Sequence, residues 1–423
     1  MINDLISFLN DSPTAFGCTK SVKETLEENG YEQLNSKKVK KGGKYYIVRN
    51  DTSIIALNIG KKLDDPSLHL CASHTDHPTF KLKPNAIHKT KNGIALNIEP
   101  YGGQLLRTWM DRPLSVAGRV VVNEDDKIVS KILVDKEPFC IIPNLAIHLN
   151  RDSDNKALNI PADITPIITL SEDFDFNQYL ADKVGVKKED ILSHDLFLYP
   201  IETAYTWGKD DEFITSGYLD NMSSVYCSLL GFIDNFNDNN INVFVAFDNE
   251  EIGSLTYQGA DSDFLESVLH RVCDDLKISY YGLLNQGMLL SFDVAQAFHP
   301  NHPEVFDAEN SCYINKGLAV KFNANQAYTS DSISYALFSK FMNRAEVPFQ
   351  TYNNKTGVRG GGTLGKLVNA HISLVSIDIG TPIWSMHSAV ETGGSEDIRT
   401  SVNALSAFYS AHLSVDEHNN YSI

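Results

Sequence analysis

The chain is poor in positive charge. Its 423 residues include 36 Lys and Arg against 54 Asp and Glu, which gives a formal net charge of −18 at pH 7. Nucleic acids and anionic membrane surfaces are bound by clustered Lys and Arg, so this composition argues against both kinds of partner. The ordinary consequence of such a charge is solubility.

Long apolar runs and secretion signals are also missing. No hydrophobic run is long enough to cross a bilayer, and residues 1–4 lack the basic and apolar segments that open a signal peptide. None of the six cysteines pairs with another in a C-x-x-C motif, and several stand in apolar runs. We therefore expect a cytoplasmic protein with buried, reduced thiols and no membrane partner.

Two familiar hydrolase motifs are absent. The chain has no H-E-x-x-H, which excludes a gluzincin-type protease, and no G-x-S-x-G elbow of a serine hydrolase. Residues 360–365 fit G-x-G-x-x-G and, with Lys366, nearly fit a P-loop, but Leu367 stands where a P-loop needs Ser or Thr. We interpret this run as a glycine-rich helix start that lines a substrate cleft, where free N–H groups favour an anionic group.

The most informative stretch follows an apolar run at residues 68–72. The run leads into the hexapeptide Ser73-His74-Thr75-Asp76-His77-Pro78. Residues two apart on a strand point to the same face, so His74 and Asp76 suit a metal-binding imidazole with a carboxylate close by.

Three further apolar runs lead to potential metal ligands. Residues 241–247 lead to Glu250 and Glu251, residues 288–292 lead to Asp293, and residues 373–379 lead, after a Gly-Thr-Pro segment, to His387. Open α/β sheets place their sites at the carboxyl ends of the strands, so we expect these side chains to converge with His74.

A predicted helix at residues 219–230 adds Asp220 to this set, although Asp at a helix start is also an ordinary N-cap. Each candidate alone has a structural explanation, and the pair Glu250 and Glu251 alone could lie on an exposed loop. It is the coincidence of four strand ends that favours a site.

Two His and several carboxylates form a two-metal hydrolytic set, in which a dication stabilises one of the two adjacent glutamates and the other works as a base. Zinc suits mixed His and carboxylate ligands, and manganese or cobalt could replace it.

The expected fold class is α/β, with more than one domain. From Tyr218 onward apolar strands alternate with helices, whereas residues 85–207 hold short alternating strands typical of an inserted, mainly β domain. We therefore predict a discontinuous catalytic domain of residues 1–84 and 208–423 around that insert. At the N-terminus, the apolar residues between Ile2 and Leu9 predict one helix, and residues 21–29 predict a second.

Five motifs, in this order, resemble the aspartyl aminopeptidase family of metallopeptidases, and the similarity runs across nearly the whole chain. One more matching segment, residues 144–151, lies in the insert. The five motifs are Ser73-His74-Thr75-Asp76-His77-Pro78, Leu219-Asp220-Asn221, Asp248-Asn249-Glu250-Glu251-Ile252-Gly253, Gly361-Gly362-Thr363-Leu364-Gly365 and Ser385-Met386-His387-Ser388.

The resemblance implies a mixed-sheet di-zinc aminopeptidase domain, phosphorylase/hydrolase-like, with an inserted β-rich dimerisation domain. It implies one zinc ion held by His74, Asp220 and Asp293. It implies a second zinc ion held by Asp220, Glu251 and His387, so that Asp220 bridges the pair.

The resemblance also implies roles for five other residues. Asp76 would orient the metal-bound histidine of its own motif, and Glu250 would be the general base. Family dimers assemble, six together, into a hollow tetrahedral dodecamer, in which His148 would reach a neighbouring subunit's site and help stabilise the reacting carbonyl. Lys321 would meet an acidic side chain at P1, the residue before the scissile bond, and Tyr328 would line the same site.

Three positions depart from the family pattern. Tyr218 stands where many members have Arg, and Gly357 stands where members commonly have Asp. Val390 stands where the Ser-Met-His-Ser motif is usually followed by a nearby Arg. None is an implied metal ligand, so the departures bear on substrate preference. We expect a metal-dependent aminopeptidase that removes N-terminal Asp or Glu from peptides with a free N-terminus. The alternatives are the same enzyme with a broader or neutral P1 preference, an inactive scaffold, or a two-metal deacetylase or carboxypeptidase on a related sheet.

Overall fold

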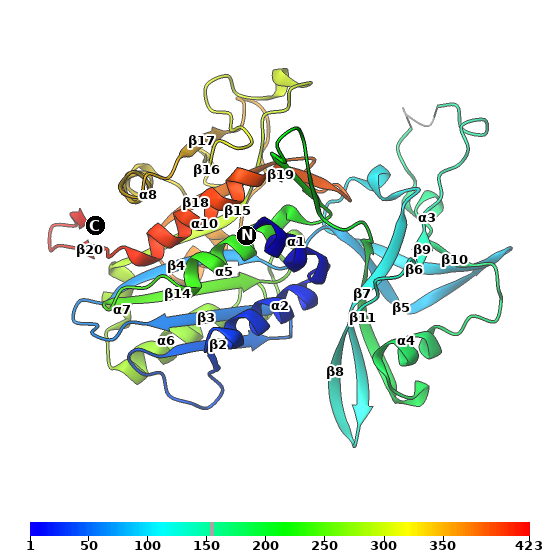
Figure 1. The fold of residues 1–423 in the computed structure, drawn as a ribbon, viewed down its shortest axis with the longest axis horizontal. Coiled ribbons are helices and arrows are strands. Elements are labelled where there is room, and N and C mark those ends of the chain that lie inside the picture. The colour runs from blue at the N-terminus through cyan, green and yellow to red at the C-terminus, as the bar shows by residue number, and fades with distance from the viewer. Residues whose placement is uncertain (153–155) are drawn as a thin grey trace.

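A computed structural model of the chain describes residues 1–152 and 156–423, and two β-sheets organise it (Figure 1). The larger, twelve-stranded sheet is built from both the first and the last parts of the chain. Its strands are β1 (Glu32–Gln33), β2 (Lys44–Arg49), β3 (Ser53–Ile59), β4 (Ser67–His74), β12 (Tyr205–Trp207), β13 (Phe213–Ser216), β14 (Asn240–Phe247), β15 (Gly287–Gln296), β16 (Leu318–Phe322), β17 (Phe349–Asn353), β18 (Val375–Trp384) and β19 (Glu391–Gly394).

The smaller, seven-stranded sheet is formed by the middle of the chain. Its strands are β5 (Thr79–Thr90), β6 (Gly93–Tyr101), β7 (Pro113–Glu124), β8 (Lys127–Val134), β9 (Cys140–Ile141), β10 (Ile167–Thr169) and β11 (Ile191–Pro200), and a separate hairpin pairs β20 (Ser414–Val415) with β21 (Tyr421–Ser422). The α-helices are α1 (Ile2–Asp11), α2 (Ala15–Glu28), α3 (Ile160–Asp163), α4 (Phe176–Val184), α5 (Leu219–Ile233), α6 (Phe264–Leu276), α7 (Tyr280–Asn285), α8 (Ser332–Arg344), α9 (Gly365–His371) and α10 (Ser395–Ser410).

Four parallel strands form the centre of the larger sheet, in the order β14, β4, β15, β18. Every residue of β4 and β14 is buried. Continuous apolar runs are typical of parallel strands that are covered on both faces. Because the four strands share one direction, their carboxyl ends meet at one edge of the sheet.

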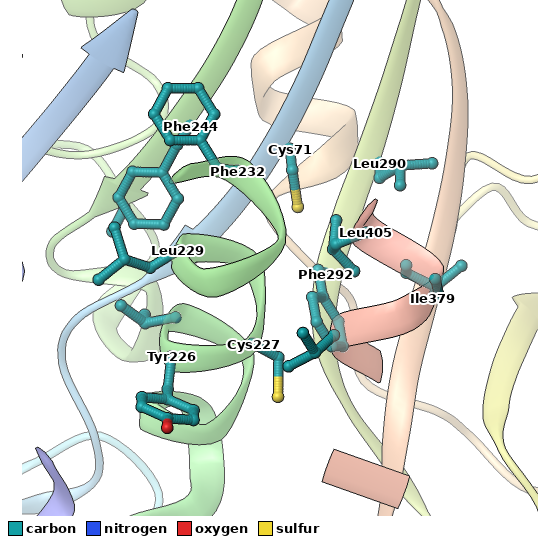
Figure 2. Close-up of a cluster of buried hydrophobic side chains, with 14 of the residues drawn as sticks. Cys71, Tyr226, Cys227, Leu229, Phe232, Phe244, Leu290, Phe292, Ile379 and Leu405 are labelled. Atoms are coloured by element: carbon teal, nitrogen blue, oxygen red, sulfur yellow. The ribbon is translucent and has the colours of Figure 1, made fainter. Parts of the chain in front are cut away.

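Helices cover both faces of this sheet. Alternate residues of β4 face opposite layers, so Cys71 lies in one apolar core and Leu70 in the other. Helices α5 and α10 pack on the first face and α6 and α9 on the second. Figure 2 shows the first core around α5, with Cys71, Tyr226, Cys227, Leu229, Phe232, Phe244, Leu290, Phe292, Ile379 and Leu405. All six cysteines are buried free thiols, as expected.

The smaller sheet closes on itself, because β11 pairs with β7 as well as with β5. Its interior is filled by a third apolar core. The expected fold class, α/β with a mixed sheet and a separate β-rich part, is confirmed. The division of the chain at residues 84 and 207 stays a prediction, and β5 crosses the first of these positions. Among the residues that the structure describes, no helix is long and apolar enough to cross a membrane.

Two local predictions were wrong. Helix α2 begins at Ala15 rather than residue 21, because the Thr14 side chain accepts a hydrogen bond from the N–H of Gly17 and caps the helix. Asp293 does not follow the end of its strand. It lies inside β15, which continues to Gln296 because it stays paired with β18.

Candidate active site

A cavity of about 310 Å³ contains the side chains that the sequence singled out. It opens at the carboxyl edge of the four central parallel strands. Residues of the glycine run, Gly361 to Thr363, form part of its wall, as predicted for a segment that lines the cleft. The candidate functional residues that line it are His74, Asp220, Glu250, Glu251, Asp293, Lys321, Tyr328 and His387.

The backbone explains how these side chains arrive together. His74 is the last residue of β4, and Asp293 lies on the neighbouring strand β15. After β14 the chain turns sharply at Asn249, whose φ of 63° is left-handed, a conformation that Asn tolerates better than most residues. A single 3-10 turn at Glu250–Ile252 follows and brings both glutamates to the edge.

Asp220 offers one carboxylate oxygen to each of the two histidines. Its Oδ1 lies 3.5 Å from Nε2 of His74, which is 3.6 Å from Oδ1 of Asp293. Its Oδ2 lies 3.4 Å from Nε2 of His387, which is 3.6 Å from Oε1 of Glu251. Ligand atoms about 2.0–2.2 Å from a tetrahedral zinc ion lie roughly 3.3–3.6 Å from one another. Two of the three distances in each triad are close to this range, and all the ligand atoms of a triad lie within 4.8 Å of one another.

The hydrogen bonds of the two imidazoles also fit a metal. Nδ1 of His74 lies 3.1 Å from the backbone oxygen of Asp76, and Nδ1 of His387 lies 3.0 Å from that of Gly103. A carbonyl oxygen only accepts, so Nδ1 carries the proton and Nε2 of the neutral ring is left for a cation. Oδ1 of Asp220 is buried and accepts no hydrogen bond within the described chain. A cation between these atoms would satisfy it.

A third group, formed by His74, Glu250 and Glu251, has ligand atoms within 4.8 Å of one another. The positions alone therefore allow Glu250 to be either a metal ligand or a base. Burial raises the pKa of Glu250 to about 7, and the nearby carboxylates of Asp293 and Asp76 act in the same direction, against the opposite effect of His74. A carboxylate of this kind is well matched to proton transfer near neutral pH.

The histidines compensate the crowded negative charge. Burial alone would raise the pKa of Asp220, but His387 and His74 outweigh burial and hold it below its usual range. Burial lowers the pKa of His387, but Asp220 and Glu251 outweigh it and raise it to about 10. In this arrangement the protonated imidazoles compensate the negative charge of the carboxylates, as a divalent cation would.

Asp76 supports both the imidazole of His74 and the turn that carries the two glutamates. Its Oδ1 accepts from the N–H of Glu250 at 3.1 Å, and its Oδ2 accepts from the N–H of Glu251 at 3.2 Å. The hydroxyl of Tyr101 donates to Oδ2 at 2.8 Å. Nδ1 of His74 is closer to the backbone oxygen of Asp76 than to its carboxylate, which lies 3.4 Å away.

Glu391 is a site residue that the sequence analysis missed. It is 1% exposed, its Oε2 accepts from the N–H of Asp220 at 2.9 Å, and its Oε1 accepts from the N–H of His387 at 2.7 Å. Only its position four residues after His387 could have drawn attention to it. A carboxylate in a short polar segment has no pattern that distinguishes it from a surface residue.

Lys321 is almost fully enclosed, with 2% of its surface exposed. Its ammonium donates to the backbone oxygen of Val294 at 3.0 Å, lies 3.6 Å from Oδ2 of Asp293, and stands 5.2 Å from the ring centre of Tyr328. Burial lowers its pKa, but Asp293, Tyr328, Asp378 and Asp220 together outweigh burial and the net shift is upward. The lysine is therefore charged in the wall of the cavity.

Two other histidines of the sequence analysis do not line this cavity. His148 lies on an exposed turn in the β-rich part of the chain. His77 is buried, but Nε2 of its ring lies 2.8 Å from the backbone oxygen of Pro13, and the ring stacks on Tyr218. Its role is in packing.

Comparison with known proteins agrees with this geometry. A family model described as "Aminopeptidase I zinc metalloprotease (M18)" matches residues 8–409. A probable M18 family aminopeptidase 2 of Clostridium novyi is 38% identical over 423 residues, which cover 96% of this chain and 98% of that protein. The cryo-EM structure of Ape4 in complex with Nbr1 superposes with a TM-score of 0.92 and 32% identity, over 96% of this chain and 85% of that one.

A more distant structure, the mApe1 dodecamer of S. cerevisiae, superposes with a TM-score of 0.84 and 25% identity, over 96% of this chain and 95% of that one. The resemblance predicted from the five motifs is confirmed. The chain belongs to the M18 family of aminopeptidase I zinc metalloproteases, and it is a metal-dependent aminopeptidase.

Proposed function

We propose that this enzyme removes N-terminal Asp or Glu from peptides. The observation that carries the proposal is the enclosed ammonium of Lys321 in a cavity whose other ionisable groups are mostly carboxylates and imidazoles. A buried cation without a use is costly, because burial disfavours its charge. An acidic P1 side chain that reaches Lys321 would give it a second carboxylate partner beside Asp293.

The proposed cofactors are two divalent ions, most simply zinc. His74, Asp220 and Asp293 would hold one, and Asp220, Glu251 and His387 the other, with Asp220 shared. The two spacings and the orphaned oxygen of Asp220 support this assignment. When bound, such ions polarise a peptide carbonyl and lower the pKa of water to about 7.

The residues of the chain would then share the remaining work. Glu250 takes a proton from the attacking water and returns it to the leaving amine, for which its pKa of about 7 is suited. Asp76 holds the turn of Glu250 in place through the N–H groups that it accepts. The cavity carboxylates attract the free α-amine of the substrate, which distinguishes an N-terminus from an internal peptide bond.

We propose further that the β-rich part forms dimers and that six dimers make a dodecamer, which is supported by the similarity to mApe1, a dodecamer. The exposure of His148 supports a role across a subunit boundary, where it would help stabilise the reacting carbonyl of a neighbour. Leu145, Ile147 and Leu149, close to His148 along the chain, are exposed at 57%, 56% and 74%. An apolar surface of this kind is typical of a segment that a partner covers.

The decisive experiment is an assay of zinc-loaded protein on dipeptides that begin with Asp, Glu or Leu, each with a free or an acetylated amine. Fast cleavage of the free Asp and Glu peptides alone is the expected result. A preference for Leu would overturn the acidic specificity. Cleavage of the acetylated peptides would favour a deacetylase or carboxypeptidase, and protein that neither holds metal nor hydrolyses any peptide would be a scaffold.

A further inference from the structure

A second cavity, of about 450 Å³, adjoins the catalytic cavity. Gly361 and Gly362 line both, so the two spaces share a wall without side chains. Asn323 and Asn325, in the loop that follows strand β16, line the second cavity. Residues at the two ends of the glycine run, including Arg359 and Lys366, line it as well.

The charge of the second cavity is opposite to that of the first. Arg359 and Lys366 line it, and within the described chain no carboxylate does. Neither cation has an ion pair or a side-chain hydrogen bond to any residue that the structure describes, and both are exposed. The chain as a whole has a net charge of −18, and the neighbouring catalytic site is crowded with carboxylates. The two unpaired cations therefore form a small positively charged patch that attracts anions.

The ammonium of Lys366 lies beside the glycine run itself. A Cβ placed on Gly362 would lie 3.3 Å from Nζ of Lys366, so the ammonium stands directly over the backbone at this residue. A side chain at residue 362 would require the ammonium to move by a few tenths of an ångström. The absence of a side chain at Gly362 therefore lets the lysine reach the wall that the two cavities share.

We propose that this cationic pocket, formed by Arg359 and Lys366, is a subsite for a carboxylate one residue beyond the scissile bond. The inference rests on the proposed function, in which the N-terminal residue is held by the metal ligands and by Lys321. The next residue of the peptide must leave the catalytic cavity, and one residue spans roughly 3.3–3.6 Å, which brings its side chain or its terminal carboxylate to the shared wall. The substrate class is then short peptides with acidic groups on both sides of the cleaved bond.

The test uses two amidated dipeptides, Asp-Ala-amide and Asp-Asp-amide, and the free acid Asp-Ala. The zinc-loaded enzyme should cleave Asp-Asp-amide and Asp-Ala with a kcat/KM about fivefold above that of Asp-Ala-amide, the size expected of two exposed charge contacts. The preference should shrink as salt is added, because exposed charges are screened. The double variant Arg359→Gln with Lys366→Gln should cleave all three equally, at the rate of Asp-Ala-amide.

A matched control removes two exposed lysines that do not line this pocket, with Lys340→Gln and Lys355→Gln, and changes the net charge by the same amount. This control should keep the fivefold preference. The inference would be overturned if the unmodified enzyme cleaved the three peptides equally. It would also be overturned if the preference survived in the Arg359 and Lys366 variant. In either case, cleavage of Asp-Ala-amide would leave the proposed function standing. Failure to cleave Asp-Ala-amide at all would instead overturn the proposed function. Stabilisation by inorganic phosphate without any substrate preference would assign the pocket to another anion and overturn the subsite.

Discussion

Glu391 accepts a hydrogen bond from the backbone N–H of Asp220 at 2.9 Å, and through its second oxygen it also accepts one from the N–H of His387 at 2.7 Å. One buried carboxylate thus joins the start of helix α5 to the turn after strand β18. These are the two segments whose side chains approach at 3.4 Å. Glu391 is a positioning residue, since it holds the backbone of both and does not line the catalytic cavity.

Replacement of Glu391 by Gln should weaken metal binding. The amide has one oxygen where the carboxylate has two, so one of the two N–H groups would face an NH₂ group and the segments would move apart. The expected result is a 10- to 100-fold loss of zinc affinity, measured by competition with a chelating dye, in a protein that remains folded. Glu396→Gln, at an exposed glutamate of α10, is the control. Unchanged zinc affinity in Glu391→Gln would show that the contacts do not hold the ligands in place.

Replacement of Glu250 by Gln should abolish turnover and spare the metal. An amide keeps the shape of the side chain but takes no proton, so kcat should fall by about 10²- to 10⁴-fold. The zinc content, measured by elemental analysis, should match that of the unmodified protein. Glu251→Gln is the contrasting variant, since it should lose metal first. If Glu250→Gln loses zinc instead, then Glu250 is a ligand, as the third group of donor atoms would permit.

Replacement of Lys321 by Met should change the P1 preference. The loss of a charged hydrogen bond in a water-poor cavity should reduce kcat/KM for Asp-terminated peptides by about 10- to 100-fold. The kcat/KM for peptides that begin with Leu should fall little or should rise. The zinc content must be measured alongside, because Lys321 lies 3.6 Å from Asp293. If kcat/KM fell equally for Asp and Leu peptides at full zinc content, Lys321 would not recognise the P1 side chain.

Mixed oligomers should reveal whether His148 acts across subunits. His148→Ala and Glu250→Gln should each be inactive alone. Subunits mixed one to one and reassembled should recover about a quarter of the unmodified activity, because half of the random dimers are mixed and each mixed dimer holds one complete site. Mixing without reassembly is the control. No recovery in reassembled oligomers would place the action of His148 within its own subunit.

Acid should destabilise the protein through His69. Burial lowers the pKa of this fully enclosed ring to about 3, and its Nδ1 lies 2.7 Å from the backbone oxygen of Phe408. The unfolded chain binds a proton below about pH 6.5, whereas the folded chain does not, so this stability is complete above pH 6.5 and is lost as the pH falls toward 3.

The loss of folding free energy through His69 should be about 2 kcal/mol between pH 6.5 and 4.5, measured by urea unfolding of metal-free protein. His69→Asn has an amide that can donate to the same carbonyl but does not titrate, so its stability should fall less steeply over this range. His418→Asn, at an exposed histidine, is the control. Parallel stability curves for His69→Asn and the unmodified protein would contradict the assignment.

Much of the site was predictable because its functional side chains lie in short segments of the sequence. The hexapeptide around His74, the pair Glu250 and Glu251, and His387 each stand near the end of an apolar run, and parallel strands bring such ends together. Asp293 was predicted for the right cavity but for the wrong reason. It lies within β15, and only its pairing with β18 keeps the strand going past it.

The sequence by itself determined the α/β class, the set of metal-type side chains and the family, because each depends on residues that are close together along the chain. Tertiary structure alone decided which carboxylate oxygen faces which imidazole, that Glu391 holds two segments at once, and that Lys366 and the catalytic cavity share the wall at Gly362. The physical reason is the strand order β14, β4, β15, β18, which is not the order of the chain. The contacts of Asp220 with His74, His387 and Glu391 form only when segments more than a hundred residues apart have packed against one another.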